Sequence, residues 1–121
     1  MKKHYFLLPI LAVFLFACSD PRLDMTNADT FEKSAKKITS SLSAQKAKDF
    51  GYALVSITLT ENLKLSAKSS FSHKVKDEEV QAQLKKLLDG KTANEVIIIA
   101  KEEEKYMENF SKELKAKGYG N

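Results

Sequence analysis

The sequence predicts an all-α protein: a small helical domain of about four helices that ends in an antiparallel helical hairpin. A cleaved signal peptide and a short tether are expected to precede the domain. Three observations support this prediction. Apolar residues recur at steps of three and four, which is the spacing of one helix face. Residues suited to helix capping stand before several of these runs. A basic start and an apolar centre set the first 17 residues apart from the rest.

Residues 1–17 have the three parts of a secretory signal peptide. Lys2 and Lys3 form a basic start, an apolar centre follows, and the small residue Ala17 ends the run. The apolar run is shorter than the ~20 residues that a helix needs to cross a bilayer. We therefore expect a signal peptide that is cleaved between Ala17 and Cys18, and not a membrane span.

Cys18 is the only cysteine of the chain and directly follows this signal. The segment Leu15-Phe16-Ala17-Cys18 resembles the lipobox of bacterial lipoproteins, which implies that a diacylglyceryl group is attached to the Cys18 thiol and that the new amino terminus is acylated. Ser19 implies, by the sorting rule of Gram-negative lipoproteins, a place in the outer membrane facing the periplasm. Several acyl chains would hold the protein firmly in the bilayer, because each buried methylene contributes ~0.8 kcal/mol. The alternative for Cys18 is a buried structural thiol or an intermolecular disulfide.

Residues 18–28 are polar, contain Pro21 and lack a sustained apolar period. We expect them to form a lipidated, flexible tether, followed by a small helical domain over residues 29–121. Asp29 and Glu32 have the spacing of a capping box at the start of the first helix. The apolar face of this helix is formed by Phe31, Ala35, Ile38 and Leu42.

A second helix is expected to begin after Ser43, which is a suitable N-cap. Its apolar side consists of Ala47, Phe50, Ala53, Leu54 and Ile57. Residues 55–60, VSITLT, also alternate between apolar and polar as a strand does. We expect a helix there, because nothing else in the mature chain offers a clear partner strand. Residues 65–76 are rich in serine and lysine and should be mostly a connection, with Phe71 as a candidate for the core.

The last two helices are predicted to form the hairpin. Asp77 is the expected cap of the first, and Gly90 should end it, because glycine adopts the left-handed conformation without steric cost. Thr92 and Glu95 have capping-box spacing at the start of a long final helix. The short link between the two helices makes them antiparallel. The apolar sides of the pair consist of Val80, Leu84, Leu87 and Leu88, and of Val96, Ala100, Met107, Phe110 and Leu114.

The charge balance argues against a nucleic-acid partner. The whole chain carries 20 Lys and Arg against 16 Asp and Glu, and two of the lysines belong to the signal. The remaining charges of both signs are interspersed from Glu32 to Lys117, as on the solvated faces of helices. With a single cysteine, neither a disulfide within the chain nor a thiolate metal site is expected.

Three further segments point to a family. They are Leu23-Asp24, the run from Phe31 to Ser34, and the run from Leu88 to Ile97. Together with the lipobox, they resemble an uncharacterised family, a domain of unknown function, of short Gram-negative bacterial lipoproteins. This resemblance covers most of the mature chain and implies an envelope location and a helical fold. Its motifs are helix starts and stops, so it implies no activity.

No catalytic or metal-binding constellation stands out, and we expect neither enzyme activity nor a cofactor or metal. His73 is the only histidine of the mature chain, which excludes sites that need two histidines. The sequence DGKT at 89–92 lacks the earlier glycine of a phosphate-binding loop, and helix capping explains its glycine and threonine. The acidic run 102–104 is expected on a solvated face, because consecutive residues of a helix point in different directions.

Two functional classes remain. The first is a non-enzymatic membrane lipoprotein, held in the bilayer through acylated Cys18, whose domain docks on an envelope protein partner. The aromatic candidates for that surface are Tyr52, Phe71, Tyr106 and Tyr119. The alternative is a periplasmic binder of a small ligand, or an inhibitor of an envelope enzyme. A cavity between residues 44–64 and the terminal hairpin would favour this alternative, whereas a filled core would favour the first class.

Overall fold

The computed structural model describes residues 20–69 and 74–120. In these residues the chain forms only α-helices, and the predicted all-α fold is confirmed. The helices are α2 (Ala28–Ser41), α3 (Ala44–Lys68), α4 (Asp77–Leu88) and α5 (Ala93–Ala116). Residues 55–60 lie inside α3, so the helical alternative is the correct one there. Residues 65–68, predicted as connection, also belong to α3, and Phe71 lies outside the described residues.

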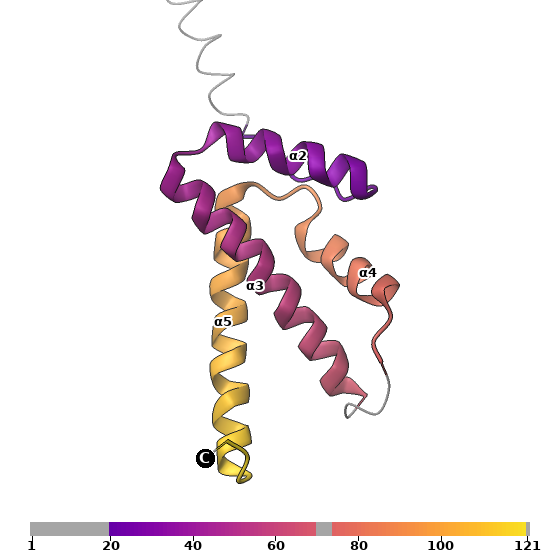
Figure 1. Ribbon diagram of the computed structural model, residues 1–121, viewed down its shortest axis with the longest axis vertical. Coiled ribbons are helices and arrows are strands. Elements are labelled where there is room, and N and C mark those ends of the chain that lie inside the picture. Colours follow the sequence, from indigo (N-terminus) through magenta and orange to yellow (C-terminus); the bar gives the residue numbers. More distant parts are fainter. Residues whose placement is uncertain (1–19, 70–73, 121) are drawn as a thin grey trace, which may run out of the picture.

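Helix α2 lies across one end of the molecule, and α5 runs away from that end as a long rod (Figure 1). Helix α3 begins at the same end and packs against α2, α4 and most extensively α5. Helices α4 and α5 run in opposite directions, as predicted for the hairpin, and diverge from their connection (Figure 1). The contacts of α3 with both of them therefore hold the domain together. None of the described helices is long and apolar enough to cross a bilayer.

The core lies near the α2 end of the molecule and contains residues of all four described helices. It is built from the predicted apolar faces together with Leu23, which precedes α2, and Ala93, the first residue of α5. Its buried members are Leu23, Ile38, Phe50, Ala53, Ile57, Leu88, Ala93, Val96 and Ala100. Beyond Ala100 the apolar residues of α5 are only partly covered, so α5 extends past the core.

Side-chain caps and one glycine separate the helices. The hydroxyl of Ser43 accepts a hydrogen bond from the Lys46 N–H at the start of α3, as predicted. Thr92 and Glu95 form the predicted capping box of α5. Gly90 has a φ of +74° immediately after α4, which is the left-handed conformation that a side chain would strain. These three boundaries follow directly from the local sequence.

Two predicted caps are wrong by one or two residues. Helix α2 begins after Asn27, whose side chain bonds the Thr30 N–H while the Thr30 hydroxyl accepts from the Asn27 N–H. This closed pair of bonds takes the place of the expected cap by Asp29. Helix α4 begins after Lys76, which gives no side-chain cap, and Asp77 lies in its first turn. There an acidic side chain still interacts favourably with the helix dipole.

The flexible tether predicted for residues 18–28 is wrong for residues 20–27, which we name the N-terminal strap. Leu23 donates its N–H to the Lys91 carbonyl (2.9 Å) and accepts from the Gly90 N–H (2.8 Å). Its side chain is 2% exposed and belongs to the core. The Met25 N–H donates to the Asp89 carboxylate (2.9 Å). The strap is therefore part of the domain, fixed to the α4–α5 connection by backbone hydrogen bonds. No apolar period in the sequence predicts this pairing.

Candidate functional site

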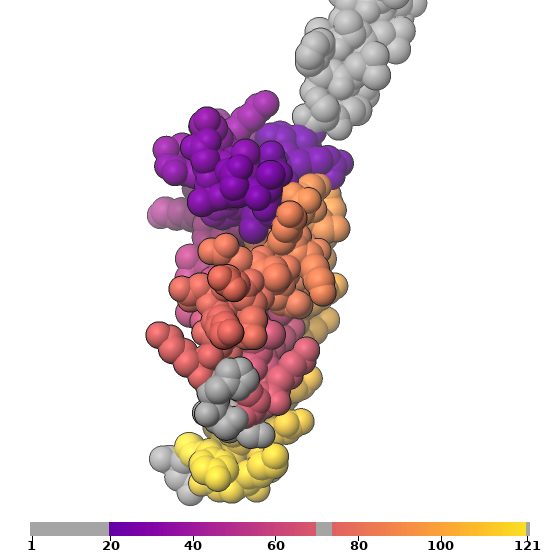
Figure 2. Space-filling view, turned by 90° about the vertical axis from the view of Figure 1, so that its right-hand side faces the viewer, coloured from indigo at the N-terminus to yellow at the C-terminus, as the bar shows by residue number. Residues whose placement is uncertain are grey.

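A groove with a volume of about 390 Å³ opens between α2, α3 and α4. Figure 2 shows the side of the molecule on which α2 lies next to α4. Apolar side chains contributed by the strap and by all three helices form most of its wall. They are Met25, Ala28, Phe31, Leu54, Ala82, Leu84 and Leu88. The volume is within the range of ~300–1,000 Å³ that is typical of small-molecule sites.

The helical period places these side chains around the groove. Phe31 belongs to the predicted apolar face of α2, and Leu84 and Leu88 are one turn apart on α4. Leu54 follows the buried Ala53 on α3 and so turns toward the edge of the core. The Thr58 hydroxyl, one turn further, donates to the Leu54 carbonyl (2.8 Å). The groove is thus the uncovered edge of the core between α2 and α4, which pack on α3 more than on each other.

Among the residues that the structure describes, Lys85 is the only charged one that lines the groove. It makes no ion pair with any residue that the structure describes. Its charge acts on the Asp24 carboxylate. Hydrogen bonds from Thr26 lower the pKa of Asp24 most strongly, and the charge of Lys85 contributes a smaller share. The groove therefore combines apolar walls with one positive charge at its edge.

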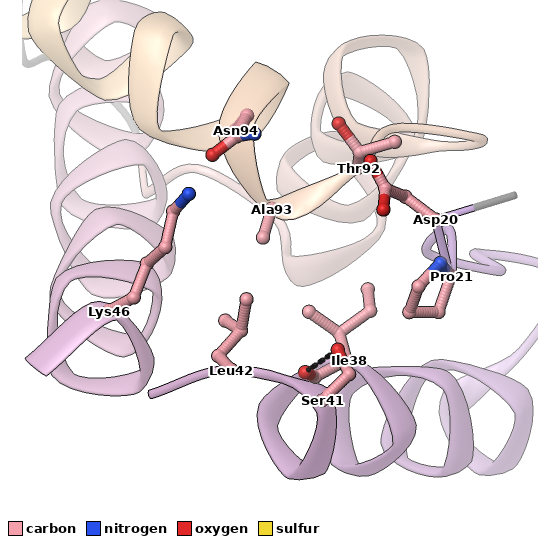
Figure 3. Close-up of a pocket in the computed structure, with 9 residues that line it drawn as sticks. All are labelled: Asp20, Pro21, Ile38, Ser41, Leu42, Lys46, Thr92, Ala93 and Asn94. Atoms are coloured by element: carbon pink, nitrogen blue, oxygen red, sulfur yellow. Dashed lines mark hydrogen bonds between the residues drawn. The ribbon is translucent and has the colours of Figure 1, made fainter. Parts of the chain in front are cut away.

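A second, smaller pocket of about 100 Å³ lies beside the first described residues of the chain. Figure 3 shows Ile38, Leu42 and Ala93 facing its interior, with the Lys46 ammonium near Asn94 at one side. Its volume is well below the ~300 Å³ of typical ligand sites. Asp20 and Pro21 form part of its wall, so the strap enters the domain next to the last turn of α2.

Two carboxylates and one ammonium meet between α3 and α5, and we name Glu61, Lys64 and Glu103 the charged cluster. The Lys64 ammonium donates to Glu61 (3.0 Å) and to Glu103 (2.8 Å). It also lies 4.7 Å from the centre of the Tyr106 ring. Glu61 is 2% and Glu103 is 6% exposed. One oxygen of Glu103, Oε2, is buried without a hydrogen-bond partner among the described residues.

Burial and hydrogen bonds shift the pKa values of Glu103 and Lys64 in the charged cluster. Burial raises the pKa of Glu103 above the ordinary value of 4.5, and the neighbouring Glu61 adds to the shift while Lys64 opposes it. Burial alone would lower the pKa of Lys64, but its hydrogen bonds to both carboxylates outweigh this effect and raise it. No three acidic, histidine or cysteine side chains of the described residues are placed to hold a metal ion. The cluster therefore joins the two helices, and none of its members lines the groove.

The charged cluster corrects the prediction for residues 102–104. Glu102 and Glu104 are exposed as expected, but Glu103 is buried. The helical period of the sequence did indicate that Glu103 is buried. Glu61 and Lys64 continue the buried row of Phe50, Ala53 and Ile57 in α3, and Glu103 stands one turn after Ala100. Extending the apolar faces across the charged residues would have found the cluster.

The other residues singled out from the sequence differ in their positions in the structure. Ala17, Cys18, Phe71 and His73 lie outside the described residues. Gly90 and Thr92 serve as helix stop and helix cap, as predicted for 89–92. Tyr106 packs in the protein, where its ring stacks on Phe110 with 6.2 Å between the ring centres. Tyr52 and Tyr119 are exposed.

Tyr52 belongs to an exposed apolar row on α3. Tyr52, Val55 and Leu59 are 71%, 59% and 66% exposed and follow one another at steps of three and four. They lie on the opposite side of α3 from Phe50, Ala53 and Ile57, which are buried. Helix α3 is therefore apolar on both sides, although the described part of the domain covers only one of them.

Comparison with known proteins identifies the chain at the level of the family. No curated protein and no solved structure matches it. A family model described as "Family of unknown function (DUF6694)" matches residues 4–105, which is most of the chain. The match includes the strap, α2, α3, α4 and the first half of α5. The expected resemblance to an uncharacterised family is confirmed, and the chain belongs to the family of unknown function DUF6694.

Proposed function

We propose that this protein is an outer-membrane lipoprotein, acylated at Cys18, that binds a small amphipathic anion in the groove between α2, α3 and α4. The groove is the observation that carries the proposal. It lies between α3 and the first helix of the hairpin, where a filled core would have favoured a purely structural or docking role. The protein acts as a binder, and its domain faces the periplasm.

The ligand class follows from the lining of the groove. An apolar chain would remove Phe31, Leu54 and Leu84 from water, and each buried methylene contributes ~0.8 kcal/mol. Lys85, as the only charge of the lining, favours a carboxylate or phosphate head over a cationic one. A fatty acid has both properties and is the simplest probe.

Binding of a fluorescent long-chain fatty acid to residues 19–121, expressed without the signal, tests the ligand. Ala82→Trp adds bulk to the groove from an exposed position of α4, so we expect it to abolish binding. Lys85→Gln should weaken binding severalfold through loss of the charge. Lys86→Gln is the matched control, because Lys86 is the exposed neighbour that does not line the groove. Equal affinity of all three variants, or equal binding of a fatty amine, would contradict the proposal.

The membrane anchor has its own test. In Cys18→Ser, oxygen replaces the sulfur that the diacylglyceryl transfer requires, so we expect an unprocessed or mislocalised protein. Fractionation of cell envelopes and the mass of the protein measure this directly. Mature, acylated protein from the Cys18→Ser gene would refute lipid attachment at this residue.

A protein partner is the second candidate, and the exposed row on α3 is the observation that favours it. Exposed apolar patches often mark interaction sites on soluble domains. A photoreactive amino acid placed in living cells at Leu59 or at Ala82 separates the two roles. Adducts with a protein at Leu59 alone favour docking, whereas small-molecule adducts at Ala82 alone favour the groove.

A further inference from the structure

We infer that the outward face of α2 is a membrane-docking surface, which rests on the phospholipid headgroups and holds α5 upright from the bilayer. This inference rests on the proposed acylation of Cys18. The surface consists of the exposed side chains of α2 that point away from the core. They are Asp29, Glu32, Lys33, Lys36, Lys37 and Ser40.

The length of chain between the lipid and the domain is the first step. The strap is fixed from Arg22 onward, where the Arg22 guanidinium donates to the Gly90 carbonyl (2.9 Å). Asp20 already lines the pocket beside α2. An extended residue spans at most ~3.6 Å, so the Cα atoms of Cys18 and Asp20 are no more than about 7 Å apart. That distance is about the depth of one headgroup layer, which is ~5–7 Å.

The position of the strap selects the end of the molecule that meets the membrane. Asp20 and Pro21 share a pocket with Ile38, Ser41 and Leu42, at the last turn of α2 (Figure 3). Helix α2 lies across this end, and α5 starts beneath it and leads away (Figure 1). A lipid attached two residues before Asp20 therefore brings α2 to the bilayer and leaves the tip of α5 far from it.

The surface of α2 is suited to headgroups and not to insertion. Lys33 pairs with Asp29 (3.0 Å) and Lys36 pairs with Glu32 (2.8 Å) on the exposed face. Lys37 has no ion pair among the described residues, so the face carries one excess positive charge. Such a face remains hydrated among zwitterionic and anionic headgroups. Because its lysines are largely paired, the short link to the lipid, more than charge, holds the face in place.

The height of the domain makes the inference measurable. Helix α5 has 24 residues, and at ~1.5 Å per residue it is about 36 Å long. Lys112 lies in the last turns of α5 and is exposed, whereas Ser40 is exposed on the outward face of α2. Acylation consumes the only native thiol, so a cysteine introduced at either position can be labelled selectively.

The experiment uses the mature acylated protein in vesicles of phosphatidylethanolamine and phosphatidylglycerol that carry a headgroup quencher. Ser40→Cys and Lys112→Cys are labelled with the same fluorophore. We expect severalfold stronger quenching at position 40 than at position 112. Insertion of ten Gly and Ser residues between Ser19 and Asp20 should remove the difference, because the domain is then free to leave the surface.

The outcomes separate this inference from the proposed function. An acylated protein with equal quenching at both positions, or with stronger quenching at position 112, would overturn the docking surface alone. A difference that persists unchanged after the linker insertion would overturn the role of the short link. If the mass of the protein shows that Cys18 carries no lipid, the proposed anchor fails and the docking surface fails with it.

Discussion

The interface between α3 and α5 has two halves that are held by different chemistry. In the half next to α2, Phe50, Ala53 and Ile57 pack with Val96 and Ala100. In the half that extends away from α2, the charged cluster occupies the same positions of the helical period. The apolar half needs no specific partner for any side chain. The charged half depends on one lysine that donates to one oxygen of each of two carboxylates.

This difference indicates which contacts stabilise the folded domain. Apolar burial contributes roughly 25 cal/mol per Å², irrespective of pH. A buried ion pair gives little net stability, because desolvation of the charges offsets their attraction. The apolar half and the strap should therefore hold the fold, while the charged cluster fixes how α3 and α5 align and makes that alignment sensitive to protonation.

Leu23→Ala should have the largest effect, because it removes a fully buried side chain of the strap from the core. Large-to-small substitutions of buried leucine cost about 2–5 kcal/mol. For a domain of this size, each kcal/mol lowers the Tm by about 4–8 °C. Thermal unfolding followed by circular dichroism measures the loss. A Tm equal to that of the wild type would show that the strap is not part of the folded core.

Gly90→Ala and Gly51→Ala are the same substitution with opposite expected signs. An added Cβ meets no atom within 4 Å at either position, so only the backbone differs. Gly90 has a positive φ, and alanine there should cost about 1–2 kcal/mol. Gly51 lies within α3, and alanine there should stabilise by about 0.5–1 kcal/mol. Melts that move in the same direction would contradict the role of Gly90 as a helix stop.

Thr92→Ala should cost about 1 kcal/mol, because it removes the cap of α5 next to the strap. Thr39→Ala is the control, since Thr39 is exposed and its hydroxyl only bonds the preceding turn. Its effect should stay within about 0.5 kcal/mol. Nucleotides should not change either melting curve. A Thr92→Ala variant that keeps its Tm but loses affinity for a phosphate compound would favour the phosphate-loop alternative.

Glu103→Gln should have the smallest effect, and this effect should be stabilising. We expect the free energy of unfolding to rise by less than about 1 kcal/mol. The pKa of Glu103 is raised above 4.5 in the folded protein. The stability that this carboxyl contributes is therefore fully present below that ordinary value and is lost as the pH rises through the folded-state pKa. We expect the Gln variant to gain stability relative to the wild type as the pH rises from 4.5 toward neutral. Urea unfolding at several pH values measures the difference.

Glu104→Gln is the matched control for this prediction, because Glu104 is the exposed neighbour of Glu103. Its difference from the wild type should stay flat over the same pH range. A Glu103→Gln variant that loses stability as the pH rises would show that the ion pair with Lys64 outweighs the burial of the carboxyl.

The sequence was sufficient where local chemistry decides the structure. The caps at Ser43 and Thr92 and the stop at Gly90 depend only on neighbouring residues. The helical state of VSITLT followed from the lack of a partner strand. These features gave the fold class and the order of the helices without any tertiary information.

Contacts between distant residues escaped prediction. The backbone of Leu23 forms hydrogen bonds with Gly90 and Lys91. A helical or strand period in the sequence does not predict such an isolated pairing between distant residues. The groove exists because α2 and α4 pack on α3 more than on each other, which depends on how the three helices cross. Glu103 is buried, although acidic residues are usually exposed. Its residue type therefore predicted exposure, whereas its position in the helical period of α5 indicated burial.

The pairing of Leu23 with the α4–α5 connection also determines how the domain would transmit mechanical force. In the proposed anchored state, a pull on the tip of α5 travels along that helix to Lys91 and Gly90. It then crosses two backbone hydrogen bonds to Leu23 and reaches the lipid through the strap. Tension would therefore first test the bonds that Arg22 and Leu23 make to Gly90 and Lys91, because these strap residues are nearest the lipid, and their rupture would lengthen the link to the membrane.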